Sequence, residues 1–145
     1  MQNVQMVAFT SLASLEVTRI EVGRIPDMAI GYFDIEDDAN VEIHHFFNAD
    51  KFAEATDGEG LQIVAAGTIT HETGEMAKWA GGEILATEET QDNYTYIDMF
   101  GNVKTRNHDD ATEAKIISPP GLEIPTALQE ASGKNVIIMF FSDME

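Results

Sequence analysis

Four histidines and a dense run of carboxylates are the side chains of this 145-residue chain that could do chemistry. Such side chains bind metals or transfer protons when two or three of them converge. The histidines are His44, His45, His71 and His108, and no HxH or HExxH spacing occurs among them. Adjacent residues of a strand point to opposite faces, so His44 and His45 cannot both serve one site. We therefore keep the four histidines only as candidate metal ligands, and we predict no metal site and no cofactor.

Sequence motifs for nucleophilic or nucleotide chemistry are missing from the chain. It contains no GxSxG, GxxxxGK[ST] or GxGxxG pattern, and it has no cysteine for thiolate or disulfide chemistry. We therefore predict no catalytic residues and no enzymatic activity. A small metal-dependent enzyme that uses the histidines remains the third functional hypothesis.

Acidic and amide side chains recur at every second position between residues 34 and 42. The alternating residues are Asp34, Glu36, Asp38, Asn40 and Glu42. A strand would place them on one face, where oxygen ligands could hold a cation. An EF-hand loop starting at Asp34 would need glycine in place of Ala39 and glutamate in place of His45, so that motif is excluded.

Three roles for this acidic segment remain open. It could be a loose cation site, a solvated edge that prevents strands from aggregating, or a mimic of nucleic acid. In the last case, carboxylates two residues apart on a strand are about 6.7 Å apart, close to the spacing of phosphates along one strand. The candidate interaction residues at the tip of the hairpin are Asp34, Glu36, Asp37, Asp38 and Glu42.

The net charge of −18, from 26 acidic and 8 basic residues, restricts the partners. It argues against direct binding to nucleic acid or to an anionic membrane. The charge is uneven, because residues 27–60 carry ten acidic residues against Lys51, whereas residues 1–26 are neutral. The expected partners are copies of the same chain or a basic protein.

Turn signals and apolar runs predict mostly strands. Residues 29–47 and 94–106 each predict a β-hairpin, with turns at residues 37–40 and at Gly101-Asn102, where glycine suits the first position of a type II′ turn. Further strands are predicted at residues 15–25, 83–87 and 135–141, and a central strand at residues 61–70. Residues 4–17 fit the spacing of both a helix and a strand, and we favour extended structure there. Short helices are predicted at residues 48–55, 74–80 and about 127–133, the last after a capping box formed by Thr126 and Gln129.

These elements predict a β-rich α+β fold. We expect one domain over residues 1–145, with an antiparallel sheet, a sandwich or a partly open barrel and two or three short helices. Residues 1–14 could form an N-terminal arm, and residues 118–125 a proline-rich loop before a C-terminal helix and strand.

The C-terminal strand contains a run of consecutive apolar residues, which departs from the alternation of a sheet with one solvated face. Both of its faces should therefore be covered, either within the domain or by a neighbouring subunit. The candidate residues for self-association are Ile137, Ile138, Met139, Phe140 and Phe141.

The functional hypothesis that joins these observations is a non-enzymatic, acidic structural protein that assembles into a homo-oligomer, such as a virion, phage-tail or capsid subunit. The alternative is an acidic DNA mimic, of an anti-defence or antitoxin-like kind, that blocks a basic nucleic-acid-binding protein. No signal peptide and no apolar run of about 20 residues is evident, so we expect a cytoplasmic protein without membrane binding, or a virion component if the structural hypothesis holds.

Overall fold

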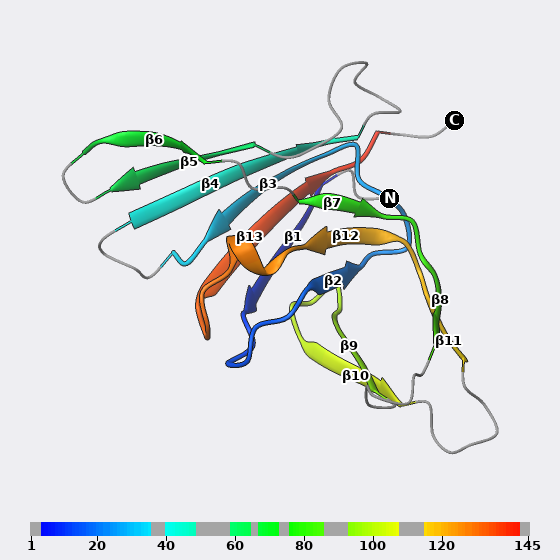
Figure 1. The fold of residues 1–145 in the computed structure, drawn as a ribbon. Helices are drawn as coiled ribbons and strands as arrows, with labels where there is room; N and C mark the ends of the chain where they lie inside the picture. Colours follow the sequence, from blue (N-terminus) through cyan, green and yellow to red (C-terminus); the bar gives the residue numbers. More distant parts are fainter. Residues whose placement is uncertain are drawn as a thin grey trace.

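The computed structural model describes residues 4–35, 40–48, 59–64, 67–72, 76–85, 93–107 and 115–142, which form β-strands arranged in three sheets. The largest sheet has six strands (Figure 1). In order across the sheet they are β1 (Val4–Thr10), β13 (Lys134–Phe140), β3 (Met28–Phe33), β4 (Asn40–Phe47), β5 (Glu59–Val64) and β6 (Ile69–Glu72). Each neighbouring pair in this sheet is antiparallel.

A second sheet of five strands lies in front of part of the first (Figure 1). In order across the sheet its strands are β10 (Val103–Asn107), β9 (Asn93–Ile97), β2 (Thr18–Glu21), β12 (Gly121–Ile124) and β7 (Ala77–Trp79). Among the described pairings, β2 with β9 is the parallel one, and it joins Ile20 to Ile97.

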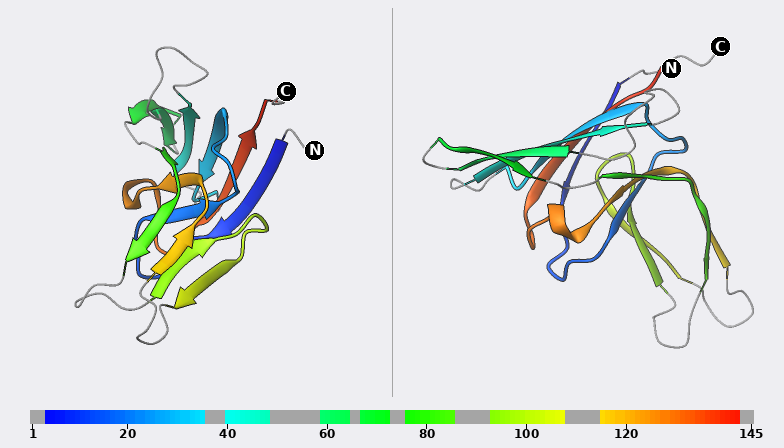
Figure 2. Two further views of the ribbon diagram at one scale, coloured as in Figure 1. Left: turned by 90° about the vertical axis from the view of Figure 1, so that its right-hand side faces the viewer. Right: turned by 45° about the horizontal axis from the view of Figure 1, so that its top comes forward.

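A two-stranded ribbon of β8 (Gly82–Leu85) and β11 (Lys115–Ser118) continues from β7 and β12. The chain bends at Gly81 and Gly82, which have φ angles of 83° and 143°, and at Pro119-Pro120 on the opposite strand. Positive φ angles suit glycine because it has no Cβ. The ribbon therefore turns away from the sheets, as Figure 2 shows.

The hydrophobic core lies between the inner faces of the two larger sheets. The six-stranded sheet contributes Val7, Phe9, Ala29, Phe33, Phe46, Ile137 and Met139, and the five-stranded sheet contributes Ile20, Ile97, Leu122 and Ile124. Met76, Leu128 and Phe141 complete this cluster. The strands β5 and β6 extend beyond the five-stranded sheet (Figures 1 and 2).

The predicted β-rich, mainly antiparallel architecture is confirmed, but the sheets do not close into a barrel, and the two or three predicted short helices are not supported by the residues that the structure describes. Within the described ranges, the helical element is η1, a 3-10 helix over Thr126–Leu128. The helix predicted at residues 74–80 is wrong over residues 77–79, which form β7. This segment is extended because it pairs with β12, so tertiary pairing overrides the local helical signals.

The helix predicted from Thr126 to about Gly133 ends after three residues because the capping box does not form. Pro125 occupies the N-cap position, and no side chain caps it. The buried Gln129 amide instead donates hydrogen bonds to the carbonyl oxygens of Ile124 and Pro125, each at 3.3 Å, and to Thr18 Oγ1 at 3.3 Å. The helix predicted at residues 48–55 lies outside the described residues from residue 49 onward.

The apolar segment 61–70 was predicted as one central strand, and this is wrong. It is divided between β5 and β6, which pair as an antiparallel hairpin at one side of the six-stranded sheet. Gly67 between them has a φ angle of 91°, which interrupts a strand. The apolar residues of this segment therefore do not mark the centre of the core.

The two predicted hairpins are confirmed as β3–β4 and β9–β10. The second turn differs from the prediction, because a five-residue loop, residues 98–102, joins its strands. Gly101 has a φ angle of 86° late in this loop rather than at the first position of a two-residue turn. Strands β1, β2, β8 and β13 fall within or overlap the segments predicted at residues 4–17, 15–25, 83–87 and 135–141.

Candidate interaction surface

The acidic segment does not form the one-sided strand edge that its sequence predicts. Strand β3 ends at Phe33, and Asp34 takes a φ angle of 54°, outside the strand region. The Asp34 backbone N–H donates a hydrogen bond to Asn135 Oδ1 at 3.0 Å, which fixes this change of direction. The alternation of carboxylates is therefore broken at its first member. Glu36, Asp37 and Asp38 lie outside the described residues.

Glu42 at the other end of the acidic segment contacts a buried histidine. His44 is 1% exposed, its Nε2 lies 3.2 Å from Glu42 Oε1, and its ring meets the Phe33 ring edge-on at 5.4 Å. His44 Nδ1 has no hydrogen-bond partner among the described residues. Glu42 therefore contacts a histidine on the inner side of the sheet. Glu42 is not part of an outward-facing row of carboxylates that could substitute for phosphates.

The remaining histidines are spread over different positions. His45 follows His44 on β4 and belongs to the opposite face, where the strand register pairs it with Ile30. His71 belongs to β6, and His108 lies outside the described residues. Within the described ranges, no group of three histidine or carboxylate side chains has the arrangement of a metal site.

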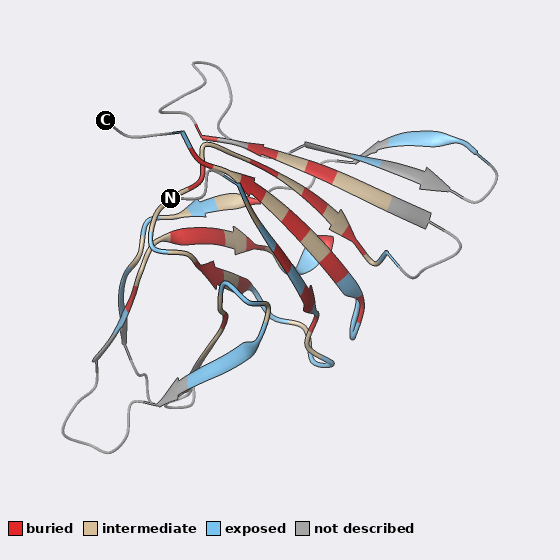
Figure 3. Ribbon diagram, turned by 180° about the vertical axis from the view of Figure 1, so that it is seen from behind, coloured by how far each residue is buried: buried red, intermediate tan, exposed pale blue. Residues whose placement is uncertain are grey.

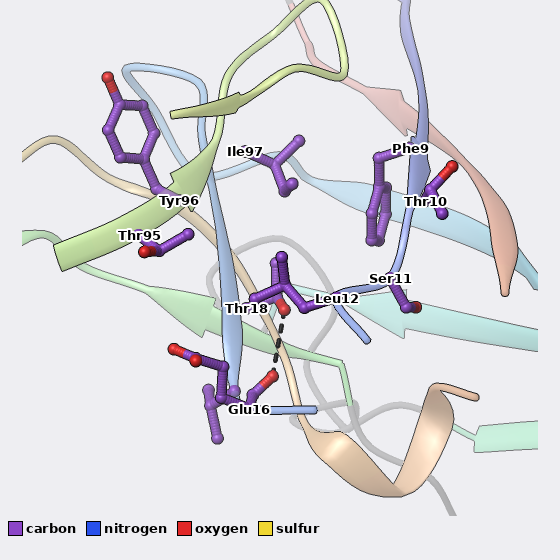
Figure 4. Close-up of a pocket in the computed structure, with 10 residues that line it drawn as sticks. Phe9, Thr10, Ser11, Leu12, Glu16, Thr18, Thr95, Tyr96 and Ile97 are labelled. Atoms are coloured by element: carbon purple, nitrogen blue, oxygen red, sulfur yellow. Dashed lines mark hydrogen bonds between the residues drawn. The ribbon is translucent and has the colours of Figure 1, made fainter. Parts of the chain in front are cut away.

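A small pocket near the end of β1 has about the volume of one water molecule, ≈ 10 Å³. Figure 4 shows its lining, which comes from the end of β1, the segment that follows it, the start of β2 and strand β9. The Thr18 hydroxyl donates a hydrogen bond across it to the Glu16 carbonyl oxygen at 3.1 Å. The other lining residues are Phe9, Thr10, Ser11, Leu12, Val17, Thr95, Tyr96 and Ile97. A space of this size does not accommodate an organic substrate.

The outer face of the six-stranded sheet carries a continuous apolar patch, which we call the outer patch. One row of register partners runs Met6, Ile138, Ile30 and His45, and a second row runs Ala8, Val136, Tyr32, Ile43 and Leu61. Val4, Phe140 and Met28 form a third row, and Ile69 on β6 completes the patch. Residues directly opposite each other in a sheet project from the same face, so these thirteen residues share one surface.

The side chains of the outer patch are exposed or intermediate, unlike those on the inner face. Met6 and Ile69 are each 63% exposed, Val4 is 47% and Leu61 is 42%. Along β13 and β3, buried residues alternate with intermediate ones, as the view from behind shows (Figure 3). The six-stranded sheet is therefore apolar on both faces, and the five-stranded sheet covers one of them.

Charged groups lie at the borders of the outer patch. The thirteen residues include no aspartate, glutamate, lysine or arginine, and His45 and Tyr32 are their titratable members, but the strand register continues the first row from His45 to Glu59 and the second from Leu61 to His71. Thr10 and Lys134, which are register partners, border it at one end. In a chain with 26 acidic residues, the part of this surface formed by β1, β13, β3 and β4 contains no carboxylate.

The outer face of the five-stranded sheet is built differently, from charged and polar side chains. Arg19 Nε donates to Glu123 Oε2 at 2.9 Å, and the Arg19 guanidinium lies 3.9 Å from the centre of the Trp79 ring. Trp79 Nε1 donates to Ser118 Oγ at 2.8 Å, and the Ser118 hydroxyl donates to Glu21 at 3.0 Å. The Arg19 guanidinium thus covers part of the Trp79 ring, so this face presents charged groups to the solvent.

The loop between β9 and β10 holds a second exposed apolar group, Phe100, which is 80% exposed. The loop is fixed by Asp98, whose Oδ1 accepts hydrogen bonds from the backbone N–H groups of Phe100 and Asn102 at 2.9 Å each. Burial raises the pKa of Asp98, but these two hydrogen bonds and the nearby charge of Lys104 outweigh it and lower the pKa below its ordinary value of 3.8.

This loop also lies against the free edge of β1. Gln5 Nε2 donates to the Met99 carbonyl oxygen at 3.3 Å, and a Cβ on Gly101 would lie 1.9 Å from the carbonyl oxygen of Ala8. The absence of a side chain at Gly101 therefore allows two backbones to touch. The contact covers part of an edge strand that could otherwise pair with another chain.

The five predicted self-association residues are divided between the two faces of β13. Ile137, Met139 and Phe141 are buried in the core, whereas Ile138 and Phe140 belong to the outer patch. Sequence reasoning missed the other members, including Met6, Ile30 and Ile69. A signal was present, because the segment 28–33, MAIGYF, also lacks the polar alternation of a strand with one solvated face.

Comparison with protein-family models, curated proteins and solved structures finds no match to this chain. No helix within the described ranges has the length and apolar character required to cross a membrane.

Proposed function

We propose that this chain is a non-enzymatic structural subunit that acts through its surfaces and assembles with copies of itself, as a virion, phage-tail or capsid subunit does. The observation that carries the proposal is the outer patch. Monomeric proteins rarely expose apolar surface of more than a few hundred Å² in one patch, and larger patches mark interaction sites. A sheet with two apolar faces, of which one is uncovered, is what a subunit of a larger assembly requires.

The acidic charge fits the same role. The acidic surfaces of two copies repel each other, whereas neutral surfaces do not. Contacts between copies are therefore favoured at the outer patch. An acidic surface also repels nucleic acid, which suits a particle or tube through which nucleic acid passes.

Imaging of the purified protein tests this proposal. Concentrated protein should form particles, rings or tubes of regular size in negative-stain electron micrographs. A field that contains nothing larger than the 15.9 kDa chain at every concentration would contradict it.

The alternative of a nucleic-acid mimic depends on the acidic segment instead. The contact between Glu42 and His44 reduces the set of phosphate substitutes to residues nearer the tip. Replacement of Glu36, Asp37 and Asp38 by lysine separates the two functions, because a mimic would lose its basic partner while an assembly subunit would still form particles. Loss of particles in this triple variant would count against assembly through the outer patch.

A further inference from the structure

We infer that the outer patch is the contact between two copies of this chain, which pack their six-stranded sheets face to face around a two-fold axis. This inference rests on the proposed function and specifies the surface and partner. It places the uncovered apolar face of one subunit against the same face of another, so that four sheets are stacked in the pair.

The chain itself has little apolar material left to cover the patch. The described strands that bear core residues already pack between the two sheets. Among the longer segments outside the described ranges, residues 86–92 (ATEETQD) and 108–114 (HDDATEA) contain no valine, isoleucine, leucine, methionine or aromatic residue, and residues 49–58 contain one, Phe52. These segments therefore supply little apolar surface to cover the patch, which favours a second molecule.

Charge favours a second copy over a different partner. A basic partner would be drawn to the acidic surfaces of a chain with a net charge of −18 rather than to a patch in which β1, β13, β3 and β4 present no carboxylate. Two copies repel each other through those acidic surfaces, and the repulsion is smallest where the contacting faces are neutral. Over β1, β13, β3 and β4 the outer patch is such a face, and the same apolar surface is presented by both copies.

The size of the patch suits a stable pair. Six strands about 4.8 Å apart span ~24 Å, and strands of about six residues span ~20 Å. The flat area of the two contacting faces together is therefore roughly 1,000 Å², without the additional surface of the projecting side chains. Stable interfaces bury about 1,200–2,000 Å² of accessible surface in total. Side chains that project from the sheets bring the pair into this range, at the usual separation of about 10 Å between packed sheets.

Two lysine substitutions with one matched control test the contact. Met6→Lys and Ile69→Lys each place a charge in the patch at a residue that is 63% exposed, so folding of the monomer should be preserved. The control is Ile117→Lys, because Ile117 is 66% exposed and lies on β11, away from the patch. Each patch variant should raise the dissociation constant of the pair at least ~30-fold, since the charge enters the contact twice.

Cysteine labelling gives a second readout that does not depend on the loss of assembly. The chain has no cysteine of its own, so Met6→Cys and Ile117→Cys each introduce one reactive group. In the assembled protein, the thiol at position 6 should react with iodoacetamide at least ~10-fold more slowly than in dilute monomer, whereas the thiol at position 117 should react at one rate throughout.

The outcomes distinguish this inference from the proposed function. Assembly that is lost in both patch variants and kept in the control supports the face-to-face contact. Assembly that persists in all three lysine variants, with equal labelling of both thiols, would overturn the contact and leave self-assembly through another surface. A wild-type chain that stays at 15.9 kDa at every concentration would overturn both.

Discussion

Met6 on β1 and Ile138 on β13 stand directly opposite each other, on the side of the six-stranded sheet that the five-stranded sheet leaves uncovered. The preceding residue of β13, Ile137, is 0% exposed and belongs to the core. One strand therefore contributes to two apolar surfaces. This division explains why the C-terminal strand has consecutive apolar residues, although the sandwich itself requires them only at alternate positions.

Ile137 and Ile138 should differ sharply when each is replaced by alanine. Ile137→Ala leaves a cavity in the core and should lower the free energy of unfolding by about 2–5 kcal/mol. Ile138→Ala, on the partly exposed face, should cost about 1 kcal/mol or less in the monomer but should weaken assembly. Chemical denaturation at concentrations that keep the chain monomeric measures both losses. Equal losses would show that the two faces of β13 are covered alike.

Gly101 and Gly67 form a second matched pair, because both have positive φ angles, 86° and 91°. A Cβ at Gly67 would meet nothing within 4 Å, so Gly67→Ala should cost only the backbone strain, about 1–2 kcal/mol. A Cβ at Gly101 would collide with the Ala8 carbonyl oxygen, so Gly101→Ala should cost about 1–3 kcal/mol more and should separate the loop from β1. Thermal unfolding of the two variants checks the order, and a larger loss at Gly67 would contradict it.

The Asp98 loop should loosen at acidic pH. Because the folded-state pKa of Asp98 is lowered, its carboxylate stabilises the loop above the unfolded-state pKa, and this contribution is lost as the pH falls through the folded-state pKa. Amide signals of Phe100 and Asn102, which donate to that carboxylate, should shift in NMR spectra with a midpoint below pH 3.8. A midpoint at or above 3.8 would be inconsistent with these hydrogen bonds.

Arg19 should control the fluorescence of the single tryptophan. Arg19→Gln removes the guanidinium that lies over Trp79, which should expose the indole ring, shift its emission to longer wavelength and lower stability by about 1 kcal/mol. The matched control is Arg24→Gln, because the Arg24 guanidinium lies 4.8 Å from the centre of the Phe141 ring and not against Trp79. An emission maximum that moves equally in both variants would refute the contact.

The sequence predicts those parts of the fold that depend on local interactions. The two hairpins follow from turn-favouring residues between apolar runs, and their strands are confirmed. Segment 77–79 could not be predicted in this way, because it is extended only by pairing with β12, about forty residues away. Gln129 likewise has the spacing of a capping residue but forms hydrogen bonds to β2 and to the end of β12.

The outer patch could be predicted only in part. Consecutive apolar residues in the C-terminal strand indicate that both of its faces are covered, but the same pattern occurs in a strand buried wholly within one subunit. Which face stays uncovered depends on how the chain divides its strands between two sheets, and Ile138 and Ile137 are indistinguishable by type. The alternating carboxylates of residues 34–42 predict a one-sided acidic row, but the structure does not contain it at either end. Asp34 lies outside the strand conformation, and Glu42 contacts His44.

The mass of the wild-type protein in solution, measured by light scattering after size exclusion at low and at high salt, tests assembly through the outer patch most directly. High salt screens the repulsion between chains of charge −18 and leaves apolar contacts intact, so the mass should be a multiple of 15.9 kDa that persists or increases with salt. A mass of 15.9 kDa under all conditions, or an assembly that dissociates as salt is raised, would contradict apolar self-assembly.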